Sequence, residues 1–297
     1  MSFSNVLNSS LILLKSRASR IFGWCWVTIV TCLIVSRGTP PLVPFLMSLA
    51  STIFMSASVY LYNDIIDSEY DVYNSLKKDR PLATGHVPLE HAKVVVYTLG
   101  LLGLVTSYLI NLYSFAFNFI YFLLFTLYSY PRVNLKKIMV VKEGIITSGI
   151  LFLTLSSSYA ITNSFSINAF VAGLIASIYL FAAQPAIGDT TDLEADRIQG
   201  VKTLASVMSW RRKMQMLVTG VLLVMTLTPL TYYYMDFNML LPILMTLASL
   251  FVLRNMIPLM NRFEAATFDR TYKIAFAFYM LIQLFFVIGS LQLNFFL

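Results

Sequence analysis

Long apolar runs recur along the chain, and they constrain the fold more than any other feature of the sequence. A helix needs about 20 mostly apolar residues to cross the hydrocarbon core of a bilayer. Nine runs of suitable length cover residues 21–37, 42–62, 93–112, 114–131, 144–162, 165–187, 214–235, 238–257 and 273–296. Hydrophobic residues make up 58% of the chain and charged residues 12%, which excludes an ordinary soluble domain. The sequence therefore predicts an all-α membrane protein, one domain over residues 1–297, with nine transmembrane helices in a bundle.

The loops between these runs fall into two groups that differ in charge. Connections after the first, third, fifth and seventh runs are short, and Arg37 is their only base. The other Lys and Arg residues lie in the remaining loops, at the run ends that border them, or in the N-terminal tail. Because such residues concentrate on the cytoplasmic side, we expect the N-terminus and the long loops in the cytoplasm and the C-terminus outside the cell membrane. This bias also accounts for the net charge of +7, so we expect no nucleic-acid partner.

Two sets of aspartates share the spacing i, i+3, i+7, which places the members of each set on one face of a helix. They are Asp64, Asp67 and Asp71, with Asn63 beside them, and Asp189, Asp192 and Asp196. Each member of the second set lies 125 positions after its counterpart, which predicts an internal duplication around 63–71 and 188–196. Both sets follow even-numbered runs and therefore share one membrane face. Like charges this close repel, so the pattern implies a compensating cation, most simply Mg²⁺, which prefers oxygen ligands.

Basic residues accompany both acidic sets, and more lie in the loop between the fourth and fifth runs. They are Lys77, Lys78 and Arg80, then Arg132, Lys136, Lys137 and Lys142, then Arg197 and Lys202. Mg²⁺ is usually bound by one or two carboxylates together with substrate phosphates, and Lys or Arg binds the other phosphate oxygens. The sequence therefore predicts a diphosphate site, which Tyr128 and Arg132, one helical turn apart, would both face. Arg211, Arg212 and Lys213 are interpreted only as membrane anchors.

Four motifs follow one another along most of the chain. They are Asn63-Asp64-x-x-Asp67-x-x-x-Asp71; Asp79-Arg80-Pro81-Leu82 with Gly85; Leu127-Tyr128-Ser129 with Leu135-Lys136; and Asp189-x-x-Asp192-x-x-x-Asp196-x-x-x-Gly200-x-Lys202-Thr203-Leu204. In this order they resemble the UbiA superfamily of intramembrane prenyltransferases. One departure is Gly188, which stands where many relatives have a base, and Pro185 before it predicts either a kink or the start of unwinding.

The resemblance implies a bundle around a central cavity, capped by cytoplasmic loops, that uses Mg²⁺ to transfer a prenyl group from a polyprenyl diphosphate to a lipophilic acceptor. Membrane lipid is a further implied partner. One Mg²⁺ would be bound by Asn63, Asp67 and Asp71, and a second by Asp192 and Asp196. Asp64 and Asp189 would be ligands or supports. The implied diphosphate ligands are Lys77, Arg80, Tyr128, Arg132, Lys136 and Lys202.

Several alternatives stay open at this point. The motif wording is most similar to geranylgeranylglyceryl phosphate geranylgeranyltransferases, which favours an ether-lipid acceptor. An aromatic acceptor such as 4-hydroxybenzoate or a naphthoate is the alternative, as is phosphoribosyl transfer to a polyprenyl phosphate. A divalent-cation or solute transporter is the rival from another class, but transporters usually place acidic groups near the bilayer midplane. The aromatic residues over 114–131 face lipid or other helices, or a subset lines a tunnel for the prenyl chain.

Overall fold

The computed structural model describes residues 3–74, 77–198, 200–261 and 264–292, and for residues 3, 189, 191, 192, 194–198 and 265 it describes the backbone alone. The described elements are all helical. They are α1 (Phe3–Val35), α2 (Leu42–Asp71), α3 (Leu89–Ile110), α4 (Leu112–Ser129), η1 (Leu135–Lys137), α5 (Val141–Thr162), α6 (Ile167–Ile198), α7 (Leu204–Val207), α8 (Trp210–Tyr234), α9 (Leu240–Met256), η2 (Ile257–Asn261) and α10 (Ala265–Ser290). Nine of them in the described chain are long and apolar enough to span a membrane. The predicted all-α class and the nine spans are confirmed.

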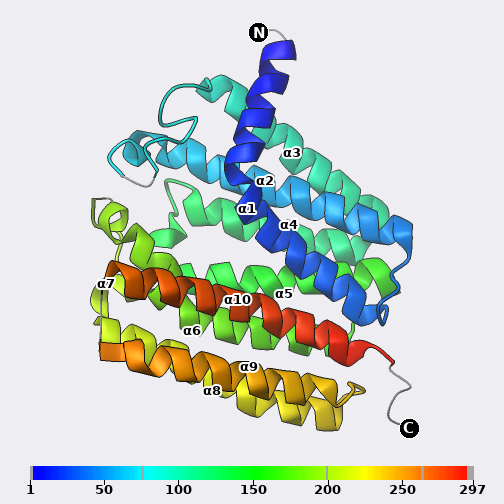
Figure 1. Ribbon diagram of the computed structural model, residues 1–297. Coiled ribbons are helices and arrows are strands. Elements are labelled where there is room, and N and C mark those ends of the chain that lie inside the picture. Colours follow the sequence, from blue (N-terminus) through cyan, green and yellow to red (C-terminus); the bar gives the residue numbers. More distant parts are fainter. Residues whose placement is uncertain (1–2, 75–76, 199, 262–263, 293–297) are drawn as a thin grey trace.

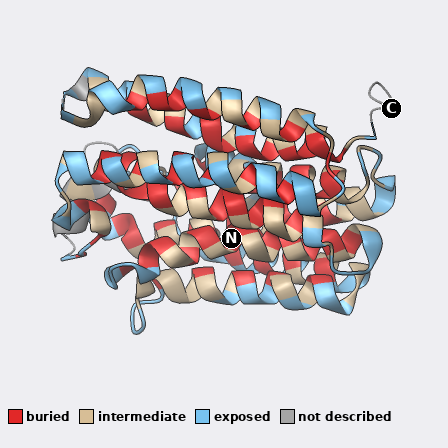
Figure 2. Cartoon of the chain, turned by 90° about the horizontal axis from the view of Figure 1, so that it is seen from below, coloured by how far each residue is buried: buried red, intermediate tan, exposed pale blue. Residues whose placement is uncertain are grey.

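The long helices lie side by side in one bundle, with α3 and α8 on opposite margins (Figure 1). The connections α1–α2, α3–α4, α5–α6 and α8–α9 are gathered at one end. The loops α2–α3, α4–α5, α6–α8 and α9–α10 are gathered at the other, which we call the long-loop end (Figure 1). Buried residues follow the faces that the helices turn toward one another, and exposed residues follow the outer faces (Figure 2). The alternation of short and long connections thus brings both acidic motifs to one end of the bundle.

Three helices extend well beyond the apolar runs that predicted them. α1 begins at Phe3 rather than near residue 21, α2 continues to Asp71, and α6 continues to Ile198. Hydropathy marks where contact with lipid would end, whereas a helix ends where its backbone hydrogen bonds end, and polar residues propagate those bonds equally well. The prediction that the helix begins to unwind at Pro185 is wrong, because α6 continues through this residue. The Pro185 carbonyl accepts a hydrogen bond from the Thr190 hydroxyl at 2.8 Å.

Small residues let the helices approach closely, as in other membrane bundles. A Cβ atom placed on Gly103 of α3 would lie 2.5 Å from Cγ of Met55 on α2. Ser51 Oγ donates to the Gly103 carbonyl at 2.9 Å, and Asn118 Nδ2 of α4 donates to Ser51 Oγ at 3.0 Å. These contacts fix α2, which carries the first acidic motif, against α3 and α4.

Candidate active site at the long-loop end

The first acidic motif lies on the last turns of α2, and its carboxylates are buried. Asp64, Asp67 and Asp71 are less than one-tenth exposed, while Asn63 is half-buried. Their helical spacing turns them toward the interior, as the sequence predicts. Burying a carboxylate is costly unless a cation and hydrogen bonds compensate for the lost hydration, so the partners of these oxygens decide what the site can do.

Two arginines neutralise Asp64. Arg17 of α1 approaches it with both sides of its guanidinium fork: Nε donates to Oδ2 at 2.6 Å, and Nη2 donates to Oδ1. Arg80 Nη1 donates to the same Oδ1 at 3.1 Å and to Asp71 Oδ2 at 2.6 Å. Arg80 therefore bridges two aspartates of the motif, and Asp64 contacts two guanidinium groups.

A lysine neutralises Asp67. Lys136 Nζ, from η1 in the loop after α4, donates to Asp67 Oδ1 and is itself buried. Asn63 Nδ2 donates to Asp67 Oδ2 at 3.0 Å and to Ser129 Oγ of α4 at 2.9 Å. The expectation that a metal ion balances these aspartates is thus incomplete, because Arg17, Arg80 and Lys136 already supply the positive charge.

The donor set nevertheless fits Mg²⁺ bound together with a diphosphate. Among the described residues, no three acids lie close enough together to hold a metal ion by themselves. Mg²⁺ typically needs only one or two carboxylates when substrate phosphates complete its shell. Asp67 and Asp71, four residues apart on α2, offer oxygens of that kind.

The other predicted ligands differ in how far they are buried and in what they contact. Lys77 is half-buried, whereas Arg132 and Lys202 are exposed, and neither of the two exposed residues forms an ion pair with a described acid. Tyr128 packs beside Phe125, with ring centroids 6.4 Å apart. The side chains of the second motif fall outside the described part of the structure. They are Asp189, Asp192 and Asp196.

Sequence reasoning missed Arg17, because its partner lies 47 positions away and belongs to another helix. The available signal was helical periodicity, since Leu13, Arg17 and Trp24 share one buried face of α1. The interpretation of Lys213 as a membrane anchor is wrong. Its side chain is buried, and Nζ donates to Thr190 Oγ1 on α6 at 3.1 Å.

An aromatic cluster lies beside the ion pairs. The Arg17 guanidinium lies 5.9 Å from the centre of the Tyr60 ring, and Trp24 Nε1 donates to the Tyr60 hydroxyl at 2.9 Å. The Trp24 ring packs edge-on against Tyr121 and Phe125 of α4, with centroids 5.6 and 5.4 Å apart. Polar groups thus give way directly to buried aromatic rings, an arrangement suited to a ligand with an anionic head and an apolar chain.

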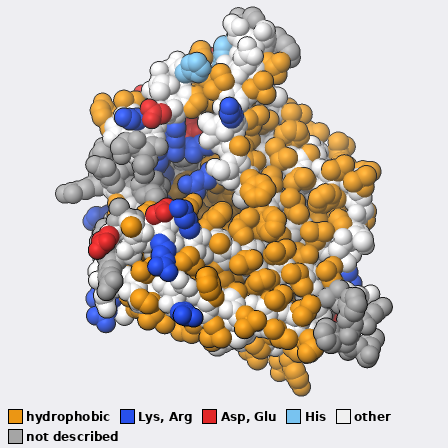
Figure 3. Space-filling model, viewed as in Figure 1, with side chains coloured by type: hydrophobic (Ala, Val, Ile, Leu, Met, Phe, Trp, Pro, Cys, Tyr) orange, Lys and Arg blue, Asp and Glu red, His pale blue; other side chains and the backbone are white. Residues whose placement is uncertain are grey.

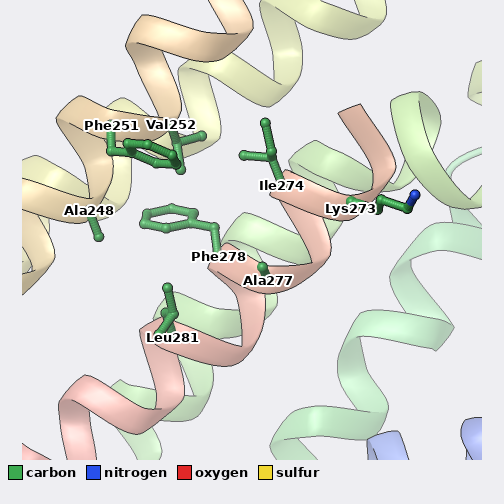
Figure 4. Close-up of a pocket in the computed structure, with 8 residues that line it drawn as sticks. All are labelled: Ala248, Phe251, Val252, Lys273, Ile274, Ala277, Phe278 and Leu281. Carbon is green, nitrogen blue, oxygen red and sulfur yellow. The ribbon is translucent and has the colours of Figure 1, made fainter. Parts of the chain in front are cut away.

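The molecular surface shows the same division. Lys and Arg side chains gather around a hollow at the long-loop end, and hydrophobic side chains cover most of the face between that end and the other (Figure 3). A separate pocket lies between α9 and α10 (Figure 4). Phe251 and Phe278 are among its lining residues, and the lining is apolar apart from Lys273. None of the predicted site residues lines that pocket, so it is distinct from the candidate site. Together these features define an integral, multi-pass membrane protein with a charged site inside one end of an apolar bundle.

The chain belongs to the UbiA prenyltransferase family, which matches residues 24–294. It is therefore an intramembrane prenyltransferase, as the motifs predicted. It is 29% identical over 262 residues to a digeranylgeranylglyceryl phosphate synthase of Sulfurisphaera tokodaii, covering 85% of this chain and 88% of that one. It is 24% identical over 230 residues to a 4-hydroxybenzoate octaprenyltransferase of Francisella tularensis, covering 77% of this chain and 79% of that one.

Solved structures share the fold. A digeranylgeranylglyceryl phosphate synthase structure superposes with a TM-score of 0.77 at 24% identity, covering 97% of this chain and 99% of that one. A UbiA homologue from Archaeoglobus fulgidus, solved with GPP and Mg²⁺, superposes with a TM-score of 0.67 at 16% identity, covering 94% of this chain and 99% of that one.

Proposed function

We propose that this protein transfers a prenyl group from a polyprenyl diphosphate to the hydroxyl of a prenylated glycerol phosphate, which is a step of ether-lipid synthesis. The network of three buried aspartates and three bases beside an aromatic cluster carries the proposal, because it suits a diphosphate head joined to a hydrocarbon chain. The relatives named digeranylgeranylglyceryl phosphate synthase support this acceptor.

In this mechanism the basic side chains bind the diphosphate and stabilise it as it leaves. Arg80 and Lys136 offer charge-assisted hydrogen bonds to phosphate oxygens, and Lys77, Arg132 and Lys202 lie on loops at the same end of the bundle. Asn63, Asp67 and Asp71 would hold a Mg²⁺ ion, with Asp192 and Asp196 for a second, and the ions would add further neutralisation of the diphosphate. Stabilising charge that develops in the transition state is often the largest catalytic contribution.

The reacting bonds follow from this arrangement. The allylic C–O bond of the donor breaks, and its electron pair leaves with the diphosphate. The oxygen of the acceptor hydroxyl then forms a new C–O bond at the allylic carbon, and its proton passes to an oxygen of the released diphosphate. The rings of Trp24, Tyr121 and Phe125 would attract the allylic cation and exclude water, which would otherwise compete with the acceptor.

To test this, the purified protein is reconstituted in liposomes and supplied with geranylgeranyl diphosphate and Mg²⁺. Geranylgeranylglyceryl phosphate and 4-hydroxybenzoate are added as acceptors in separate reactions. Mass spectrometry should detect the prenylated glycerol phosphate alone, and EDTA should abolish it. Product with 4-hydroxybenzoate alone would assign the chain to quinone synthesis, which the Francisella relatives favour. Release of no diphosphate with either acceptor would refute the proposal, and phosphoribosyl transfer would be tested next.

We also propose that the long-loop end faces the cytoplasm of a cell-membrane protein. All the Lys and Arg residues except Arg37 lie in these loops, on the helix ends that border them or in the N-terminal segment. A cysteine introduced at the exposed Lys137 should react with a membrane-impermeant maleimide only after cells are opened, and the two native cysteines are buried. Labelling of Lys137→Cys in intact cells would reverse the assigned orientation.

A further inference from the structure

Arg80 differs from the other charged groups of its network in that it reaches toward the surface. Its side chain is 21% exposed, whereas those of Asp64 and Asp71 are at most 5% exposed. Asp64 and Asp71 both accept from the same nitrogen, Nη1. Arg80 is therefore the guanidinium of this network best placed to meet an anion that arrives from the hollow, and the groups behind it set its position.

Asp64 is the group that anchors Arg80 from the inside. Both of its oxygens accept hydrogen bonds from guanidinium groups, Oδ2 from Arg17 and Oδ1 from Arg17 and Arg80. A carboxylate held in this way has its orientation fixed by the planar fork of the arginine, which a lysine cannot reproduce. Both of its oxygens face guanidinium groups, whereas among the described residues only Oδ1 of Asp67 and only Oδ2 of Asp71 accept from a cationic group.

Arg17 is in turn held in place. It is buried, and its guanidinium lies over the Tyr60 ring, whose hydroxyl accepts a hydrogen bond from Trp24. A chain of fixed contacts thus runs from the aromatic cluster through Arg17 and Asp64 to Arg80.

We propose that Arg17 is a positioning residue for the diphosphate site, and that Asp64 is an anchor for Arg80 rather than a metal ligand. The inference rests on the proposed function. Arg17 shares the negative charge of Asp64, and this sharing lets Arg80 interact with a phosphate oxygen. Without Arg17, Asp64 attracts Arg80 alone, and Arg80 is held more tightly inward. Loss of Arg17 should therefore weaken donor binding specifically.

The experiment compares Arg17→Met and Arg17→Lys with a matched control, Arg20→Met. Arg20 lies on the same helix three residues later and is exposed. In the liposome assay we expect Arg17→Met to raise KM for the donor diphosphate about tenfold, the loss typical of one misplaced charge-assisted hydrogen bond. We expect KM for the acceptor to stay the same. Arg17→Lys should raise the donor KM less, because it keeps the charge but not the fork, and Arg20→Met should match wild type.

A second measurement does not depend on catalysis. Hydrogen exchange of the 77–88 segment, followed by mass spectrometry, should slow in Arg17→Met, where Asp64 holds Arg80 more tightly, and accelerate in Asp64→Asn, where Arg80 loses its inner anchor. It should not change in Arg20→Met. If Arg17→Met does not fold, as judged by its melting curve, Arg17→Lys and Asp64→Asn carry the same comparison.

The outcomes separate the inference from the proposed function. Wild-type protein that transfers no prenyl group would refute the proposed function and this inference with it. Active wild-type protein whose Arg17 variants match Arg20→Met, or raise both KM values equally, would refute the inference alone. An Asp64→Asn variant that chiefly needs more Mg²⁺, with an unchanged donor KM, would show that Asp64 is a metal ligand.

Discussion

Glu143 ties the loop that carries Lys202 to the bundle, and its replacement gives the sharpest test of the packing at the long-loop end. Its side chain, in the first turn of α5, is fully buried. Its Oε1 accepts the backbone N–H of Leu204 at 3.1 Å, and its Oε2 has no hydrogen-bond partner among the described residues. Leu204 begins α7 two residues after Lys202, so this bond ties the backbone next to the lysine to α5.

The size of the effect follows from these contacts. Glu143→Ala leaves the Leu204 N–H without an acceptor in a buried place, which costs about 1–3 kcal/mol of unfolding free energy. Glu143→Gln keeps a carbonyl acceptor and removes a buried negative charge, so it should cost less than the alanine variant. Under the proposed role of Lys202 in binding the diphosphate, the alanine variant should also lose prenyl transfer.

Reversible unfolding with SDS in mixed micelles would measure both variants, alongside prenyl transfer in liposomes. Glu90→Ala is the control, because Glu90 is exposed in the first turn of α3 and, among the described residues, its ion pair is with the exposed Lys93. It should leave stability and activity unchanged. The reasoning fails if Glu143→Ala is as stable as wild type, or if the glutamine variant is destabilised as much as the alanine variant.

Three further changes have defined outcomes. Lys136→Met leaves Asp67 buried without its cation and should lower the unfolding free energy by about 3–5 kcal/mol; adding Asp67→Asn should recover part of that loss in the same SDS titration, and no recovery would contradict the pairing. Gly103→Ala forces a methyl group against Met55 and should cost about 1–3 kcal/mol, which thermal melting in detergent would detect; a wild-type melting temperature would show that α2 and α3 separate easily. Asp71→Asn should raise the Mg²⁺ concentration for half-maximal transfer, measured by Mg²⁺ titration, and an unchanged midpoint would exclude Asp71 as a ligand.

Much of the fold could be predicted because apolar length and loop charge are local properties. The run over 42–62 predicted a membrane span and the spacing of Asp64 and Asp71 a common helical face, and α2 confirms both. Helix ends could not be predicted in this way, because polar residues continue a helix after the apolar run stops. The start of α1 at Phe3 is the largest example.

The candidate site was predictable where its residues are close in sequence or belong to a motif. Arg80 and Lys136 were found in this way, and both contact the aspartates. Arg17 belongs to no motif, and its role depends on how α1 packs against α2, which no local pattern reports. Lys213 was misread because a basic triplet next to an apolar run is also typical of a membrane anchor.

The pairing of Arg17 with Asp64 has a consequence for how the protein is made. The two residues are 47 positions apart, and the arginine comes first. At about 5–20 residues per second, a ribosome adds Asp64 roughly 2 to 9 seconds after Arg17. The cation is therefore already present in the growing chain when the carboxylate emerges, and the hairpin of α1 and α2 can enter the bilayer with this charge neutralised. A circular permutant that moves α1 behind α10 would reverse the order, and Asp64 would then have to insert before its arginine exists.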